Sequence, residues 1–270
     1  MKKVLAGVVL SFAAVQSGFA HFPMLIHDTP FAEVNQPVQF MYAVGHPYEQ
    51  EYAPAAKPEK VYVVSPDGSQ QDITDQLTEG TYQVDDITAE VWNFEYAPAD
   101  FGDSIVALNS EPLFGLNQVV NQEYLKVILH ASGQSGWDQR TGQPIEIVPL
   151  TRPYGMEEGF VFTGQLMQGD QPLAGVDIEI EQFLTHVPRP EDLPPEPMIT
   201  RVVKTDVNGI FSYTLPNPGW WILAASVDNA GVITLDGNEY TLNGLAALWV
   251  HVEEKFIQKF PSTVSNWNQR

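Results

Sequence analysis

The sequence predicts an all-β protein, made of two Ig-like or transthyretin-like β-sandwich domains after a signal peptide. Short segments alternate apolar and polar residues with a period of two, and few stretches show the apolar stripe of an amphipathic helix. Turn sequences such as Pro66-Asp67-Gly68 and Val207-Asn208-Gly209 separate these segments. Hydrophobic residues make up 44% of the 270 positions, which is enough to form sandwich cores.

The first twenty residues have the features of a secretory signal peptide. Two lysines precede an apolar run over residues 4–15, and the small residues Gly18 and Ala20 follow it. The run is shorter than the roughly 20 residues that span a bilayer, so we expect cleavage after Ala20 rather than membrane insertion. The sequence therefore predicts export to the periplasm and a mature chain that begins at His21.

The predicted strands follow one another in two groups. In the first half we expect strands at residues 38–44, 60–65, 81–84, 91–96, 104–109 and 124–130. After a segment rich in Gly, Ser and Gln, we expect strands at residues 160–167, 176–183, 200–205, 210–215, 221–226 and 246–251. We thus predict a signal peptide over residues 1–20, sandwich domains over 21–145 and 146–253, and a polar tail over 254–270.

Composition excludes several classes of function. The chain has 13 Lys and Arg against 34 Asp and Glu, and this net charge of −21 disfavours nucleic acids and anionic lipid as partners. The absence of cysteine excludes disulfides, zinc–cysteine sites and cysteine nucleophiles. The sequence also lacks a nucleophile elbow, a phosphate loop and a dinucleotide fingerprint, so we expect no enzyme and no organic cofactor.

Histidine is the residue type that points to a metal. If cleavage follows Ala20, His21 offers both its α-amine and its imidazole, and these two nitrogens close a chelate ring on one ion. Nitrogen donors favour nickel and copper over the lighter first-row ions. The alternative interpretation is that cleavage leaves a histidine there by chance. On the first interpretation, the sequence predicts a site for a divalent transition metal at His21.

Three further residues are candidate ligands. His46 and Glu49 lie three residues apart on a loop at the end of a predicted strand, where both side chains can converge on one ion. The alternative is a turn with a surface histidine. His27 is a weaker candidate, since six residues of extended chain separate it from His21 by roughly 20 Å.

Two other functions remain open on the residues alone. Trp220 and Trp221 form a stacking platform if they are exposed, which would indicate a carbohydrate-binding or adhesion module. A copper-handling periplasmic protein shares the exported sandwich and the terminal histidine. Because Cu²⁺ outcompetes Ni²⁺ at most nitrogen sites, affinity does not separate these two metals.

Several blocks of the sequence resemble a known family. They are His21-Phe22-Pro23-Met24-Leu25-Ile26, Gly45-His46-Pro47-Tyr48-Glu49, Gly136-Trp137-Asp138, residues 146–155, residues 204–211 and Pro218-Gly219-Trp220-Trp221. Over nearly the whole mature chain, the sequence is similar to the periplasmic component family of bacterial nickel and cobalt uptake, an exported family of unknown domain function. The resemblance implies binding of Ni²⁺ or Co²⁺ as cargo for a membrane metal-uptake transporter. It also favours His21 and the loop of His46 and Glu49 as the metal ligands.

Overall fold

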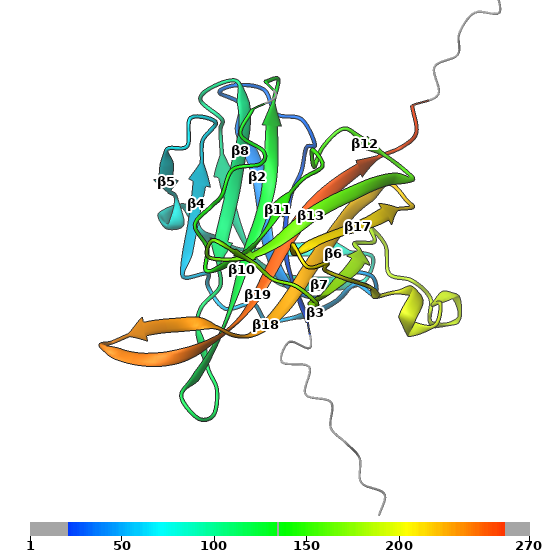
Figure 1. The fold of residues 1–270 in the computed structure, drawn as a ribbon. Coiled ribbons are helices and arrows are strands. Elements are labelled where there is room, and N and C mark those ends of the chain that lie inside the picture. The colour runs from blue at the N-terminus through cyan, green and yellow to red at the C-terminus, as the bar shows by residue number, and fades with distance from the viewer. Residues whose placement is uncertain (1–20, 134, 257–270) are drawn as a thin grey trace, which may run out of the picture.

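The computed structural model describes residues 21–133 and 135–256. These residues form β-strands and short 3₁₀ helices without any α-helix, so the all-β prediction is confirmed (Figure 1). No helix in these two ranges has the length and apolarity to cross a membrane. The predicted signal peptide, and the predicted tail from residue 257 on, lie outside the described residues.

The strands form three sheets. The five-stranded sheet has the order β1 (Phe22–His27), β2 (Val38–His46), β7 (Ile87–Tyr96) and β6 (Thr78–Val84), with β3 (Glu51–Ala53) beside β2. The ten-stranded sheet has the order β16 (Arg201–Lys204), β15 (Asp177–Gln182), β18 (Gly219–Leu235), β19 (Asn238–Glu253), β10 (Val119–Ala131), β8 (Gly102–Asn109), β4 (Lys60–Val64) and β5 (Gln70–Asp72), with β12 (Met156–Glu157) beside β19 and β9 (Leu113–Phe114) beside β10. The four-stranded sheet contains β11 (Ile145–Pro149), β13 (Phe160–Gln168), β14 (Gln171–Pro172) and β17 (Ile210–Leu215). The 3₁₀ helices are η1 (Thr74–Gln76), η2 (Pro190–Asp192) and η3 (Glu196–Met198).

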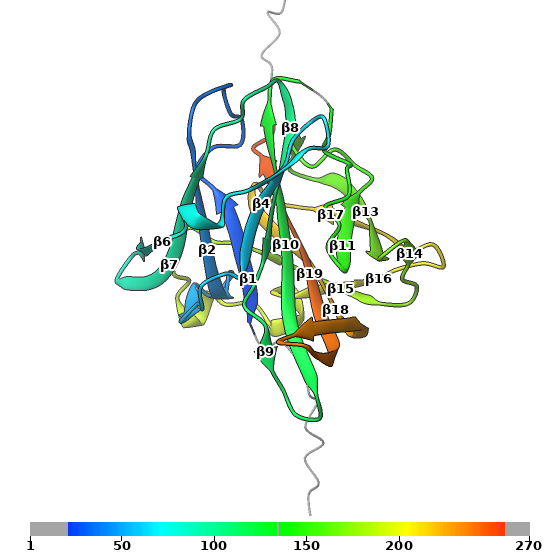
Figure 2. The same ribbon diagram turned by 90° about the vertical axis from the view of Figure 1, so that its left-hand side faces the viewer.

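The ten-stranded sheet lies between the other two sheets and is buried on both faces over its middle. Along β4, Val61 and Val63 pack into the core shared with the five-stranded sheet, whereas Tyr62 and Val64 pack into the core shared with the four-stranded sheet. The same alternation occurs along β8, β18 and β19. Figure 2 shows the layers side by side, with β1, β2, β6 and β7 on one side and β11, β13 and β17 on the other. Burial on both faces explains why residues 221–225 and 245–250 are almost continuously apolar.

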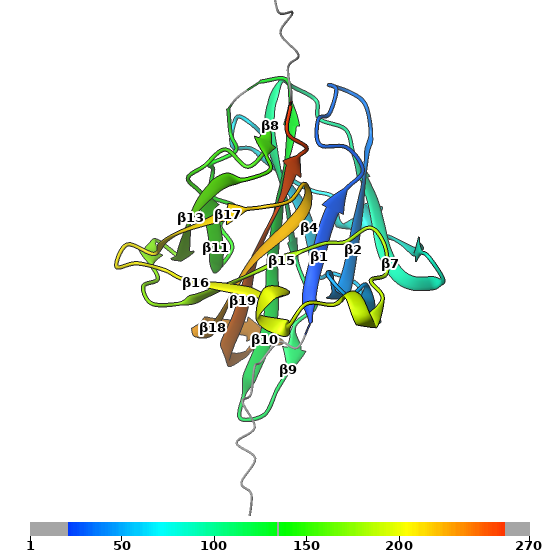
Figure 3. The same cartoon turned by 90° about the vertical axis from the view of Figure 1, so that its right-hand side faces the viewer.

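The central sheet joins the two halves of the chain. β10 of the first half pairs in parallel with β19 of the second half, from Val119 opposite Thr241 to Val127 opposite Trp249 (Figure 3). Both hydrophobic cores contain residues of both halves. The predicted division at residues 145 and 146 therefore separates strands that share one sheet, and it stays a prediction about how the chain folds.

Candidate metal centre

His21 and His46 lie opposite each other at one end of the five-stranded sheet. β1 and β2 pair antiparallel with Phe22 opposite Gly45, and the next position along this register places His21 opposite His46. The centroids of the two imidazole rings are 4.9 Å apart, and the rings are tilted by 51°. His21 is exposed and His46 is half-buried, so an ion from solvent can reach the pair.

The separation of the rings fits two ligands of one ion. A metal about 2.1 Å from a ring nitrogen lies about 3.2 Å from the centroid of that ring. Two imidazoles at about a right angle around such an ion therefore have centroids about 4.5 Å apart, close to the 4.9 Å observed. Together, the two side chains supply two nitrogen donors on neighbouring strands.

Gly45 fixes the backbone beneath this pair. A Cβ atom at Gly45 would lie 2.0 Å from the backbone oxygen of Glu51, so only glycine allows β3 to approach β2 here. His46 in turn lies opposite Glu51 in the β2–β3 register. This close pairing holds the end of β2, and with it His46, beside His21, the residue that precedes β1.

Glu49 does not gather with the two histidines. No three His, Cys, Asp or Glu side chains come together as an ion-binding group anywhere in residues 21–133 or 135–256. The Oε2 atom of Glu49 is instead buried without a hydrogen-bond partner. Glu49 acts electrostatically on a second carboxyl, that of Glu181 in β15. The end of β2 thus places His46 beside His21, whereas Glu49 in the following loop lies near Glu181 of the central sheet.

Glu181 belongs to the surroundings of this loop and was not predicted from the sequence. Its Oε1 accepts a hydrogen bond from the backbone N–H of Tyr48 at 3.1 Å, and its Oε2 accepts one from the Thr200 hydroxyl at 2.6 Å. Burial raises its pKa to about 7, and the neighbouring Glu49 and Glu179 add to the increase. Alternation with Ile178 and Ile180 would place Glu181 in solvent, but the loop after β2 covers that face.

His27 lies at the other end of β1. It is opposite Phe40 in the β1–β2 register, so the structure does not bring it to His21 and His46. Its ring is buried in edge contact with Trp220 at 4.7 Å, and both ring nitrogens lack a hydrogen bond of ordinary geometry. Burial lowers the pKa of His27 to about 4, although nearby backbone groups oppose that shift. The imidazole is therefore neutral at pH 7.

The other histidines form separate arrangements. Nδ1 of His130 lies 2.6 Å from Oδ1 of Asp103, and the Tyr154 hydroxyl donates to Oδ2 of Asp103 at 2.9 Å. Nδ1 of His251 lies 3.1 Å from Oε1 of Glu253. None of these groups lies in the β1–β2 register of the His21–His46 pair.

The tryptophans proposed as a sugar platform are not an exposed row. Trp221 is fully buried. Trp220 is half-buried and lies between His27 and His251, at 4.7 and 5.1 Å. These positions remove the observation on which the sequence-based carbohydrate hypothesis depended.

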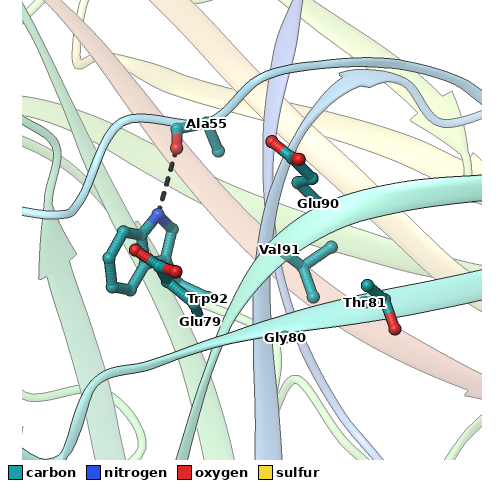
Figure 4. Close-up of a pocket in the computed structure, with 7 residues that line it drawn as sticks. All are labelled: Ala55, Glu79, Gly80, Thr81, Glu90, Val91 and Trp92. Carbon is teal, nitrogen blue, oxygen red and sulfur yellow. Dashed lines mark hydrogen bonds between the residues drawn. The ribbon is translucent and has the colours of Figure 1, made fainter.

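Trp92 lies instead in a pocket on β6 and β7 (Figure 4). Its indole N–H donates to the backbone oxygen of Ala55 at 3.0 Å, and the Glu79 and Glu90 side chains also line the pocket. The Lys57 ammonium lies 5.8 Å from the centre of the Trp92 ring. The pocket therefore combines an aromatic face with two carboxylates.

Comparisons with known proteins give a family and distant structural similarities. The family model described as "Domain of unknown function (DUF4198)" matches residues 18–229. No curated protein matches the chain.

Three solved structures match most of this chain at low identity. The D0-D1 domain of Intimin is 12% identical over 85% of this chain and 98% of that chain, with a TM-score of 0.21. A DUF4785 family protein from Legionella pneumophila is 9% identical over 83% of this chain and 55% of that chain, with a TM-score of 0.30. The Yersinia pseudotuberculosis adhesin InvE is 12% identical over 84% of this chain and 58% of that chain, with a TM-score of 0.21. Similarity at this level carries no argument about function.

Proposed function

The chain belongs to the DUF4198 family of domains of unknown function, and we propose that it binds a divalent transition-metal ion in the periplasm. The ion is Ni²⁺ or Co²⁺, carried as cargo for a membrane metal-uptake transporter. The single observation that carries the proposal is the placement of the His21 and His46 rings, whose centroids are 4.9 Å apart.

The third donor in this proposal is the α-amine of His21. Signal cleavage after Ala20 would create that amine next to the imidazole of the same residue. Amine and imidazole then chelate the ion from one strand while His46 binds it from the next. Such a site needs no third His, Cys, Asp or Glu side chain.

Charge supports the capture of a cation. The net charge of −21 draws cations toward the surface and accelerates their encounter with the site. Glu51 lies opposite His46, and Glu49 lies in the turn between these two residues. Glu49 is a further donor if the loop turns toward the ion, whereas His27 is a donor of this site only if β1 bends.

The test is calorimetric titration of Ni²⁺ into the processed protein, with the terminus at His21 established by mass spectrometry. We expect His21→Ala, His46→Ala and a glycine inserted before His21 each to weaken binding by at least about tenfold, which is about 1.4 kcal/mol. His186→Ala, which replaces an exposed histidine that is not a predicted ligand, is the matched control. Unchanged affinity in both histidine variants would falsify the proposal. Cu²⁺ binding tightly at the same residues does not decide the cargo, so expression under nickel or copper limitation separates the two metals.

A carbohydrate-binding or adhesion module is the second candidate, and the Trp92 pocket now favours it. An aromatic face between Glu79 and Glu90 offers stacking to a sugar ring and acceptors to its hydroxyls. Screening defined glycans against the protein and its Trp92→Ala variant tests this candidate. Binding that is lost in that variant, in a protein that fails to bind Ni²⁺, would replace the metal proposal.

A further inference from the structure

A four-stranded blade extends from the central sheet. It consists of residues 113–121 and 229–242. These are β9, the start of β10, the end of β18 and the start of β19. Parallel pairing of Val119 with Thr241 holds its two hairpins together. In Figures 1 and 2 both hairpins project past the packed layers. Val120, Ala230 and Leu242 of the blade are still buried, whereas other apolar side chains of the same strands are uncovered here.

Both faces of the blade carry exposed apolar side chains. Phe114, 64% exposed, lies on one face in edge contact with Tyr240 at 5.2 Å. Leu113 and Val232 lie on the other face and are 60% and 67% exposed. Leu116 at the hairpin tip is 86% exposed. A strand with a solvated face normally places polar residues on it, so apolar side chains on two bare faces indicate a surface that is covered by a partner.

One edge of the blade is open. β15 pairs with β18 only as far as Ala224, and within the described ranges the segment from Gly231 to Leu235 pairs on its β19 side alone. Its outward N–H and C=O groups are free to receive another strand. An extended segment that adds to this edge would place alternate side chains on the two faces of the blade.

Charge defines the partner. The blade contains the acidic residues Asp236 and Glu239 and no Lys or Arg, and Glu111 and Asp228 lie just outside its two segments. This sign repels a second copy of the chain and anionic lipid, and it attracts a basic segment.

We propose that the blade is a docking element for a partner protein that presents an extended segment of alternating basic and apolar residues. The segment adds as a strand to the open edge of β18. Its basic side chains lie on the face of Val232, where their stems cover Val232 and their charges approach Glu239. Its apolar side chains lie on the opposite face, beside Ile233 and Tyr240. The proposal does not depend on which metal or ligand the rest of the chain binds.

The probe is a fluorescently labelled peptide of alternating lysine and valine, capped at both ends and titrated with the full chain by anisotropy. We expect it to bind, with affinity that falls as salt rises, and a glutamate–valine peptide not to bind. Val232→Lys places a charge on the open edge and should weaken binding by about tenfold or more. The matched control is Val207→Lys, since Val207 is 83% exposed in the turn between β16 and β17. Leu116→Ser is a second variant that leaves the strands intact.

Each other outcome overturns the proposal. Equal peptide affinity in the Val232→Lys and Val207→Lys variants would mean that the acidic surface binds the peptide without the blade. Self-association in sedimentation that Val232→Lys abolishes would make the blade an interface between copies. Binding to zwitterionic vesicles that Leu116→Ser abolishes would make it a lipid contact.

Discussion

Buried ionisable groups on the two faces of the central sheet have different partners and different pKa shifts. On the face toward the four-stranded sheet, Lys126 and Glu146 form a fully buried ion pair at 2.8 Å. On the face toward the five-stranded sheet, Glu181 and His27 have pKa values of about 7 and about 4. Lys126 and Glu146 keep their charges by pairing, whereas burial favours the neutral forms of Glu181 and His27 on the second face and of Asp103 on the first. The predicted metal residues lie on the second side, where the loop after His46 contacts Glu181.

We expect the largest loss of stability from breaking the buried Lys126–Glu146 pair. Burial alone would raise the pKa of Glu146, but Lys126 and Arg140 lower it to about 2, so the carboxylate is charged. Lys126→Met leaves that charge without its buried partner and should reduce the free energy of unfolding by about 3–5 kcal/mol in urea denaturation. Lys204→Met is the matched control, because the Lys204–Asp177 pair is 61% and 58% exposed and its loss should change stability by less than about 1 kcal/mol.

A double variant sharpens this prediction. In Lys126→Met the Glu146 carboxylate keeps only Arg140 as an ionic partner. Replacing both buried residues, as Lys126→Met with Glu146→Leu, removes that carboxylate and should recover part of the stability that Lys126→Met loses. A Lys126→Met protein as stable as Lys204→Met would show that the two faces do not differ in the way proposed here.

On the other face, the raised pKa of Glu181 should make the protein less stable as pH rises. Its pKa in the folded protein is about 7 against an ordinary 4.5, so the folded state holds a proton that the unfolded state has released. The stabilisation is fully present below about pH 4.5 and is lost as pH rises through about 7, up to about 3 kcal/mol. Denaturation of Glu181→Gln from about pH 5 to 8 should show a smaller loss.

Glu123 titrates in the same window and supplies the comparison. Burial raises its pKa to about 7, with the Tyr42 hydroxyl opposing the shift. Glu181→Gln should therefore remove only part of the pH dependence, and Glu123→Gln another part. If Glu181→Gln keeps the whole slope of the native chain, the carboxyl beside Glu49 is charged at neutral pH and the two faces are more alike than their burial implies.

Local patterns predicted much of the fold and only part of the site. Each predicted strand overlaps an observed one, because alternation and turn residues act over a few positions. The parallel pairing of β10 with β19 joins residues more than a hundred positions apart, and no local pattern encodes it. The same limit applies to Glu181. Its alternation with Ile178 and Ile180 predicts solvent exposure, but the loop after β2, which is distant in sequence, covers it. His21 and His46 were selected for their chemistry, but their placement depends on the register of β1, a strand the sequence did not predict.

His27 gives the smallest predicted effect at neutral pH and a distinct one in acid. Both ring nitrogens are buried and lack a hydrogen bond of ordinary geometry, so His27→Phe should change stability by less than about 1 kcal/mol near pH 7.5. The folded pKa of about 4 lies below the ordinary 6.5, so the unfolded state binds a proton first. Stability is fully present above about pH 6.5 and is lost as pH falls toward 4, and His27→Phe should remove this loss.

Titration of Ni²⁺ into the His27→Phe protein tests whether His27 belongs to the metal site. Six residues of β1 separate it from His21, so His27→Phe should bind Ni²⁺ as the native chain does, whereas His46→Ala should not. His186→Phe, an exposed position, is the control for both measurements. A His27→Phe protein that keeps the acid loss but binds Ni²⁺ more weakly would move the ion to the buried end of β1. In that case the buried, neutral imidazole of His27 would be a ligand of the ion.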